Sequence, residues 1–126
     1  MTDLWLDDVR LPEGDFVGSV WVKDVSQAIL HLEHMTFARA SLDHDLSLIG
    51  SVGPEGTGYD VVLWMVEHDV WPTEGIIVHS WNVPAALRMC ATINQFGPYK
   101  TQTQHLPAQG LPFFDPNLRN DHVQSD

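Results

Sequence analysis

Short apolar runs alternate with longer amphipathic stretches along this chain. Runs bounded by Gly, Pro or polar residues predict strands at residues 4–6, 17–22, 37–43 and 75–79. Helical spacing of apolar residues predicts helices at about residues 25–34, 57–71 and 83–96. A Gln- and Thr-rich run at 99–105 predicts a last strand, at an edge of the sheet.

Strands that alternate with helices favour a mainly parallel sheet covered on both faces, which is a three-layer α/β sandwich. The first connection departs from this rule, because residues 9–16 are fewer than a helical crossover between parallel neighbours needs. We therefore expect a loop in place of the first helix. Residues 1–107 are predicted to form the domain, and residues 108–126 a C-terminal loop or tail.

Composition fits one acidic domain with a hydrophobic core. The 126 residues are 44% hydrophobic and include five Trp, and 17 acids against 6 bases give a net charge of -11. This charge argues against duplex DNA and anionic membranes as partners. The single Cys90 cannot form an internal disulfide and the N-terminus does not resemble a signal peptide, so a cytoplasmic location is expected.

Carboxylates collect where the predicted strands end. Asp7 and Asp8 follow the first strand, and Asp43 and Asp45 lie at the end of the third. Parallel strands bring such ends to one sheet edge, where ligands bind. Grouped carboxylates repel one another unless a hard cation neutralises them, so Asp7, Asp8 and Asp43 are predicted to bind a divalent metal, Mg²⁺ or Mn²⁺. Alternatively, Asp8 and Asp45 simply cap loops.

Two histidines end neighbouring predicted strands. His44 stands between Asp43 and Asp45, and His79 closes the run at 75–79. Two imidazoles with carboxylate partners can divide general base and general acid work, or can ligate a transition metal. A buried histidine on its own more often makes only a structural hydrogen bond.

Other polar residues lie beside these strand ends. Ser80 and Asn82 can bind phosphate oxygens, or Asn82 can cap the next helix, and Trp81 can stack on a nucleobase. Arg10 is the candidate phosphate clamp, unless it pairs with a nearby carboxylate, Asp8 or Asp45. The alternative cations are Lys100 and His105.

The order of these residues resembles a receiver domain. In that likeness Asp7 and Asp8 match the metal-binding pair, Asp43 the phosphoacceptor and Ser80 the hydroxyl position; the cation position is matched weakly by Lys100 or His105. A phosphoacceptor site has no use for His44 and His79, and the first helix is absent, so the resemblance to an ordinary receiver is partial.

Four segments together resemble the receiver-like family named for cyclic-phosphate processing. They are Leu-Trp-Leu-Asp-Asp-Val-Arg, Ser-Leu-Asp-His-Asp-Leu, Thr-Gly-Tyr-Asp and Val-His-Ser-Trp-Asn, within about residues 3–94. The resemblance implies a receiver-like (flavodoxin-like) fold. It also implies action on cyclic phosphate ends of RNA or on cyclic nucleotides, in repair or in phage–host conflict.

The resulting hypothesis is a metal-assisted hydrolase of a cyclic phosphodiester. His44, held by Asp43 or Asp45, would be the base and His79 the acid, with the roles exchangeable. Metal and Arg10 would neutralise the charge on phosphate. The alternative is a non-catalytic degenerate receiver, or an acidic phage-type protein, that binds a protein partner or a nucleotide.

Overall fold

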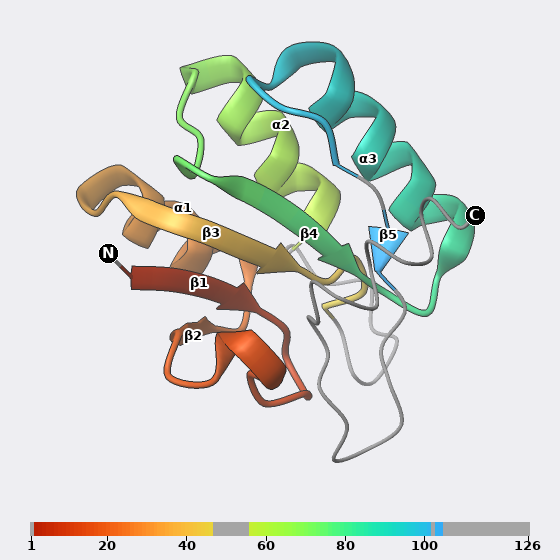
Figure 1. Ribbon diagram of the computed structural model, residues 1–126. Coiled ribbons are helices and arrows are strands. Elements are labelled where there is room, and N and C mark those ends of the chain that lie inside the picture. Colours follow the sequence, from red (N-terminus) through yellow and green to blue (C-terminus); the bar gives the residue numbers. More distant parts are fainter. Residues whose placement is uncertain (1, 47–55, 102, 105–126) are drawn as a thin grey trace.

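A parallel five-stranded sheet organises the part of the chain that the computed structural model describes, residues 2–46, 56–101 and 103–104 (Figure 1). Its strands are β1 (Thr2–Leu6), β2 (Val20–Val22), β3 (Phe37–Leu42), β4 (Gly75–His79) and β5 (Thr103–Gln104). Their spatial order is β2-β1-β3-β4-β5, with all neighbours parallel. The carboxyl ends of β1, β3 and β4 therefore lie next to one another.

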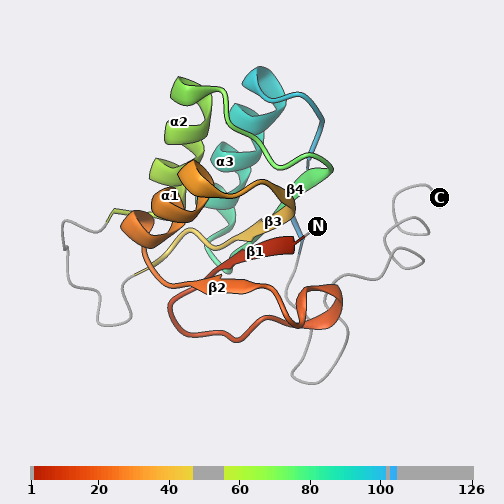
Figure 2. The same ribbon diagram turned by 90° about the vertical axis from the view of Figure 1, so that its left-hand side faces the viewer.

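The helices of the described residues pack together against one face of this sheet (Figure 2). They are α1 (Val25–His34), α2 (Gly58–His68) and α3 (Val83–Phe96). Their buried residues join one core with every second residue of the central strands, including Leu4, Leu6, Ala40, Leu42, Ile76 and Val78. This alternation is what a strand with one face against helices requires.

The helix starts are set by side-chain caps. The Asp24 carboxylate accepts a hydrogen bond from Gln27 N at the start of α1. Thr57 and Asp60 form a capping box at the start of α2. Each cap satisfies backbone N–H groups that have no partner within the helix, so the sequence defines where each helix begins.

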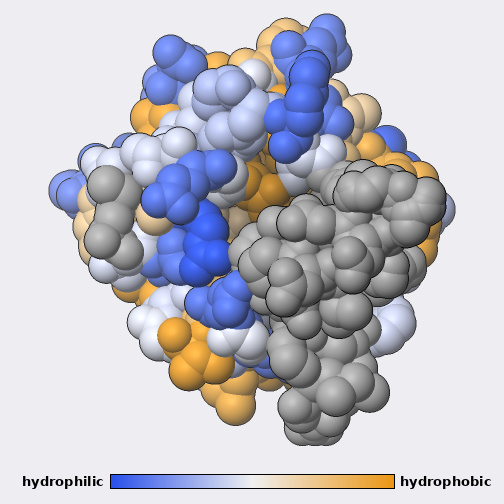
Figure 3. Space-filling view, viewed as in Figure 1, coloured by the Kyte–Doolittle hydropathy of each residue, from blue (hydrophilic) through white to orange (hydrophobic). Residues whose placement is uncertain are grey.

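The opposite face of the sheet carries a smaller aromatic cluster. Trp5 and Phe16 are fully buried there, with Trp21 and Ile77 packed against them. Phe16 comes from a 3₁₀ turn, η1 (Gly14–Phe16), in the connection from β1 to β2. Figure 3 shows hydrophilic residues over the β1–β3 part of this face; Arg39 pairs there with Asp3 at 2.6 Å.

The receiver-like parallel sheet and the loop in place of the first helix are confirmed. One detail of the layering differs, since the face opposite the helices is covered, among the described residues, by η1 and its flanking loop. The connection is too short for a helix, and Trp5 and Phe16 supply the apolar cover that a helix would otherwise provide. β2 is also shorter than predicted, because Val17 N bonds Gly14 O and closes the turn.

Other expectations fall at the limits of the described residues. The predicted strand at 99–105 is shorter in the structure, where β5 covers only Thr103–Gln104. Before it, the backbone N–H of Thr101 donates to Asn94 Oδ1 at 2.5 Å. His105 and the predicted tail at 108–126 lie outside the described residues. Within the described part of the chain, no helix has the length and apolar character needed to cross a membrane.

Candidate functional site

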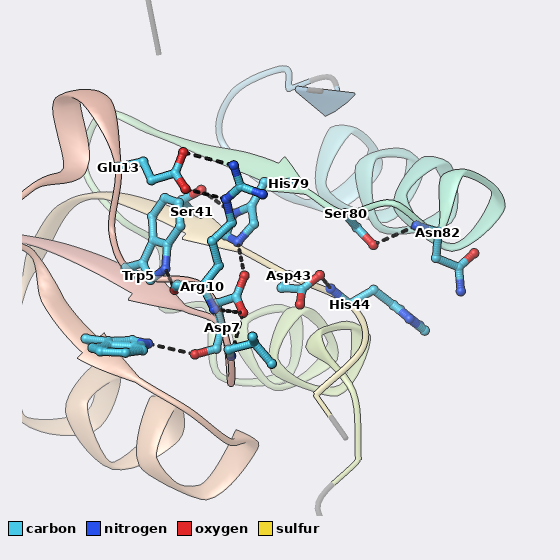
Figure 4. A network of polar contacts seen from close by, with 12 residues as sticks. Trp5, Asp7, Arg10, Glu13, Ser41, Asp43, His44, His79, Ser80 and Asn82 are labelled. Atoms are coloured by element: carbon cyan, nitrogen blue, oxygen red, sulfur yellow. Dashed lines mark hydrogen bonds and ion pairs between the residues drawn. The ribbon is translucent and has the colours of Figure 1, made fainter. Parts of the chain in front are cut away.

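Three carboxylates meet where β1 and β3 end. Two of them, Asp7 and Asp43, are seen in Figure 4. The backbone brings them together, because Asp7 N donates to Val22 O at 3.1 Å and Asp43 N donates to Leu6 O at 3.0 Å. One oxygen each of Asp7, Asp8 and Asp43 lies within 4.8 Å of the others. Of the four acids expected at this edge of the sheet, Asp7, Asp8 and Asp43 meet, whereas Asp45 lies outside their cluster and pairs with His44.

Asp7 is buried, but both oxygens of its carboxylate accept hydrogen bonds. Its Oδ1 accepts hydrogen bonds from Val9 N at 2.9 Å and Arg10 N at 2.8 Å, and its Oδ2 accepts one from His79 Nε2 at 3.0 Å. Burial alone would raise the pKa of Asp7, but the bonds from His79 and the two backbone groups outweigh it and lower the pKa. Asp7 is thus ionised at neutral pH.

Asp43 behaves in the opposite way. Its carboxylate accepts a hydrogen bond from His44 N at 2.8 Å. Burial, followed by the negative charge of Asp7, raises the pKa of Asp43 to about 8. At neutral pH and without a cation, this carboxyl group therefore holds a proton for most of the time.

The donor set of this cluster fits a hard divalent cation. It consists of carboxylate oxygens, which Mg²⁺, Mn²⁺ and Ca²⁺ prefer over nitrogen or sulfur. A cation would also relieve the repulsion between Asp7 and Asp43. Asp7, Asp8 and Asp43 make up the one such group found among the described residues, and it includes no histidine. These three carboxylates therefore suit Mg²⁺ or Mn²⁺ better than a transition metal that prefers histidine ligands.

His79 is an interior residue with 0% exposure. Its ring stacks on Trp5 with a centroid distance of 4.3 Å, its Nε2 contacts Asp7, and its Nδ1 lies 2.6 Å from Ser41 Oγ. Burial lowers the pKa of His79 and favours a neutral ring. This disagrees with the role predicted for His79 as the acid that protonates a substrate, because both ring nitrogens are engaged inside the protein.

His44 faces in a different direction. Its Nδ1 lies 2.6 Å from Asp45 Oδ1, and its ring extends away from Asp43 and His79 (Figure 4). The His44 side chain retains 15% exposure and that of Asp45 60%. Of the two histidines, His44 is therefore the one placed at the surface, with Asp45 and not Asp43 as the partner of its ring.

The residues after β4 form the start of α3. The Asn82 Oδ1 atom accepts from Ala85 N at 3.2 Å, so Asn82 is the helix cap. Its Nδ2 is 3.5 Å from Asp45 Oδ1, while Ser80 Oγ accepts from Asn82 N at 3.1 Å. Trp81 is 70% exposed between them. A second role for Ser80 and Asn82 in binding phosphate stays a prediction.

The predicted cations have other partners in this structure. The guanidinium of Arg10 binds Glu13, with Nε 2.5 Å from Oε2 and a second bond of 3.1 Å. Lys100 Nζ donates to Asn94 O at 3.1 Å. Arg10 therefore forms an ion pair with Glu13, which was not among its predicted partners. Its use as a phosphate clamp stays a prediction.

Three contributors to the site were not predicted. Ser41 and Trp5 contact His79, and strand alternation is the signal that could have found them, since residues 5 and 7 share a face, as do 41 and 43. Gly58 is the other case: a Cβ there would lie 1.9 Å from Asp43 O. Only glycine lets α2 begin this close to the end of β3.

The fold and the acid cluster define the class of protein as receiver-like, and solved structures agree on the fold. The signal receiver domain of a protein described as a Luxo repressor, from Vibrio parahaemolyticus, is 14% identical with a TM-score of 0.56, and the match covers 97% of this chain and 86% of that one. A response regulator from Burkholderia pseudomallei is 12% identical with a TM-score of 0.59, covering 98% and 72%. A receiver domain from Methanospirillum hungatei JF-1 is 13% identical with a TM-score of 0.53, covering 98% and 90%.

The family is defined more narrowly by sequence. Residues 2–95 match the model of the cyclic-phosphate processing receiver domain, so the chain belongs to that family. No curated protein is a significant match to this chain. The family assignment agrees with the resemblance seen in the four sequence segments.

Proposed function

We propose that the protein is a metal-assisted phosphoesterase that hydrolyses a cyclic phosphate, either a 2′,3′-cyclic phosphate RNA end or a cyclic nucleotide or oligonucleotide. The observation that carries the proposal is the meeting of three carboxylates with a surface histidine–carboxylate pair at one sheet edge. The family name supports the substrate class.

Asp7, Asp8 and Asp43 would hold the metal in this proposal. A divalent cation bound there would neutralise charge on the phosphate oxygens and make water more acidic. A related fold supports an oxygen-ligand site, since the Burkholderia pseudomallei response regulator was solved with a calcium ion and a phosphorylated aspartic acid.

His44 is the general base of the proposed reaction. Its Nδ1–H donates to the Asp45 carboxylate, which leaves the Nε2 lone pair to accept a proton. Water attacks phosphorus, its proton passes to His44 Nε2, and one ring P–O bond breaks. The leaving oxygen takes a proton from solvent, because His79 is buried and cannot deliver one.

Substrate recognition is assigned to the residues around His44. Trp81 offers an exposed aromatic face for a nucleobase. Ser80, Asn82 and Arg10 remain the candidates for phosphate oxygens, and Arg10 would have to leave Glu13 to reach one. This arrangement favours a nucleotide over a cyclic phosphate without a base.

The test is an assay of 2′,3′-cyclic nucleotides, RNA with cyclic phosphate ends and cyclic oligonucleotides, each with Mg²⁺, Mn²⁺ or EDTA. We expect ring opening of at least one substrate, suppressed by EDTA and by Asp43→Ala. Absence of turnover on the whole panel by folded protein would contradict the proposal.

A non-catalytic module is the alternative, favoured by the burial of His79, which removes the second catalytic histidine. In that case the protein binds a nucleotide or a protein partner and catalyses no reaction. Nucleotide-dependent quenching of Trp fluorescence without product, or a stoichiometric partner retained by His44→Ala, would favour this alternative.

A further inference from the structure

A buried hydrogen-bond chain reaches the acid cluster from inside the sheet. Ser41 Oγ lies 2.6 Å from His79 Nδ1, and His79 Nε2 lies 3.0 Å from Asp7 Oδ2 (Figure 4). Ser41 and His79 are both 0% exposed, and Asp7 is 4% exposed. The chain thus joins β3 and β4 to the residue that follows β1.

The direction of this chain follows from its ends. An ionised carboxylate only accepts hydrogen bonds, so His79 must carry its proton on Nε2 and donate it to Asp7. The Nδ1 atom of the neutral ring is then an acceptor, and the Ser41 hydroxyl donates to it. Ser41 therefore selects the tautomer that His79 needs to bind Asp7.

The ring is also fixed in its plane. Trp5 stacks on it at an interplanar angle of 16°, and the Trp5 indole is itself tied by a 2.7 Å bond from Nε1 to Arg10 O. Arg10 N in turn donates to Asp7 Oδ1. The carboxylate of Asp7 is thus held through both oxygens by groups that are themselves held in place.

We propose that Ser41 and His79 are positioning residues that orient the Asp7 carboxylate for a divalent cation. The inference rests on the metal site of the proposed function and adds the residues that orient one of its ligands. Partners behind a metal ligand typically affect metal affinity by ten- to a hundredfold.

The same three residue types form the nucleophile, the general base and its orienting carboxylate in serine hydrolases, but that role does not fit here. A nucleophilic serine must reach its substrate, and Ser41 is fully buried. His79 also has no exposed nitrogen with which to exchange a proton. The chain is therefore assigned to positioning.

The first test reads the tautomer without any metal. Long-range ¹⁵N–¹H correlation spectra of the imidazole rings should place the His79 proton on Nε2 in wild type. Ser41→Ala should broaden or split this signal, because the ring loses the donor that selects the tautomer. A proton on Nδ1, a charged ring, or a spectrum that Ser41→Ala leaves unchanged would overturn the proposal.

The second test measures Mn²⁺ affinity by titration calorimetry on folded full-length protein. His79→Leu should weaken binding by roughly ten- to a hundredfold, while His79→Gln, which keeps an N–H donor, should lose clearly less. The Mn²⁺ affinity of Ser41→Ala should lie between those of His79→Leu and wild type. Ile77→Val is the matched control, since Ile77 packs on the same face without a polar contact to Asp7.

The outcomes separate this inference from the proposed function. If Ser41→Ala and His79→Leu bind Mn²⁺ as wild type does, the positioning role is wrong even where cyclic phosphates are hydrolysed. If the affinities change as expected and no cyclic phosphate is hydrolysed, the proposed reaction fails and the positioning role stands. Wild type that binds no Mn²⁺ overturns both. Ser41→Ala carries the test even if His79→Leu does not fold.

Discussion

Asp7 and Asp43 belong to one cluster, yet their pKa values move in opposite directions. Burial opposes ionisation of both. Asp7 receives hydrogen bonds from His79 and two backbone groups that outweigh burial, whereas burial and the charge of Asp7 raise the pKa of Asp43 to about 8. Without a cation, the cluster combines an ionised carboxylate with a largely protonated one.

The first prediction is that metal binding releases a proton. A cation needs Asp43 ionised, so binding at about pH 6 to 7 should displace about one proton, and the apparent affinity should rise up to about pH 8. Calorimetry in buffers of different ionisation enthalpy measures the release. Asp43→Asn should abolish it; equal affinities at pH 6 and pH 8 in wild type would contradict this prediction.

Stability without metal should depend on Asp43 with a defined sign. Its folded pKa of about 8 exceeds the ordinary value of 3.8 for aspartate, so the folded state holds the proton that the unfolded state has lost. The free energy of unfolding should therefore fall as the pH rises from about 4 to 8. Asp43→Asn should stabilise the protein at pH 8 by roughly 1–3 kcal/mol in urea denaturation. A less stable variant would count against the raised pKa.

Asp7 should have the opposite effect. Its lowered pKa contributes stability that is present above the ordinary value of 3.8 and is lost as the pH falls through the folded pKa. Asp7→Ala removes the acceptor of three hydrogen bonds and should cost about 2–4 kcal/mol at neutral pH. Asp24→Ala, which loses a surface helix cap, is the control and should cost about 1 kcal/mol.

Gly58 should tolerate no side chain. A Cβ at 1.9 Å from Asp43 O forces α2 away from the end of β3, so Gly58→Ala should destabilise the protein by at least about 3 kcal/mol. Gly18→Ala provides a control, because Gly18 has φ of +92° but nothing within 4 Å of its Cβ position. Thermal unfolding compares the two; a similar loss in both would argue against the steric explanation.

His44 should be the histidine on which turnover depends. His44→Ala should lower kcat roughly a hundredfold to ten-thousandfold if it accepts a proton in the transition state. His68→Ala is the control, since its ring bonds Trp64 O on the surface of α2. Steady-state kinetics on the best cyclic phosphate would measure both. Equal kcat values for His44→Ala and wild type would exclude His44 as the base.

Much of this arrangement is readable in the sequence because it depends on short-range patterns. Alternating strand and helix periods predict the parallel sheet, and acids after the first and third strands predict the cluster of Asp7, Asp8 and Asp43. The short β1–β2 connection likewise predicts that the first helix is missing. These features follow from the reach of the chain and the rule that parallel strands end at one edge.

The surroundings of the two histidine rings are decided by the tertiary structure. His79 lies within β4 and follows its alternation, so its ring turns inward to Trp5, Ser41 and Asp7. His44 lies beyond the end of β3, where no alternation applies, and its ring turns to Asp45. Both follow apolar runs in the sequence; only the packing of three separate strands determines that one is buried and the other reaches the surface.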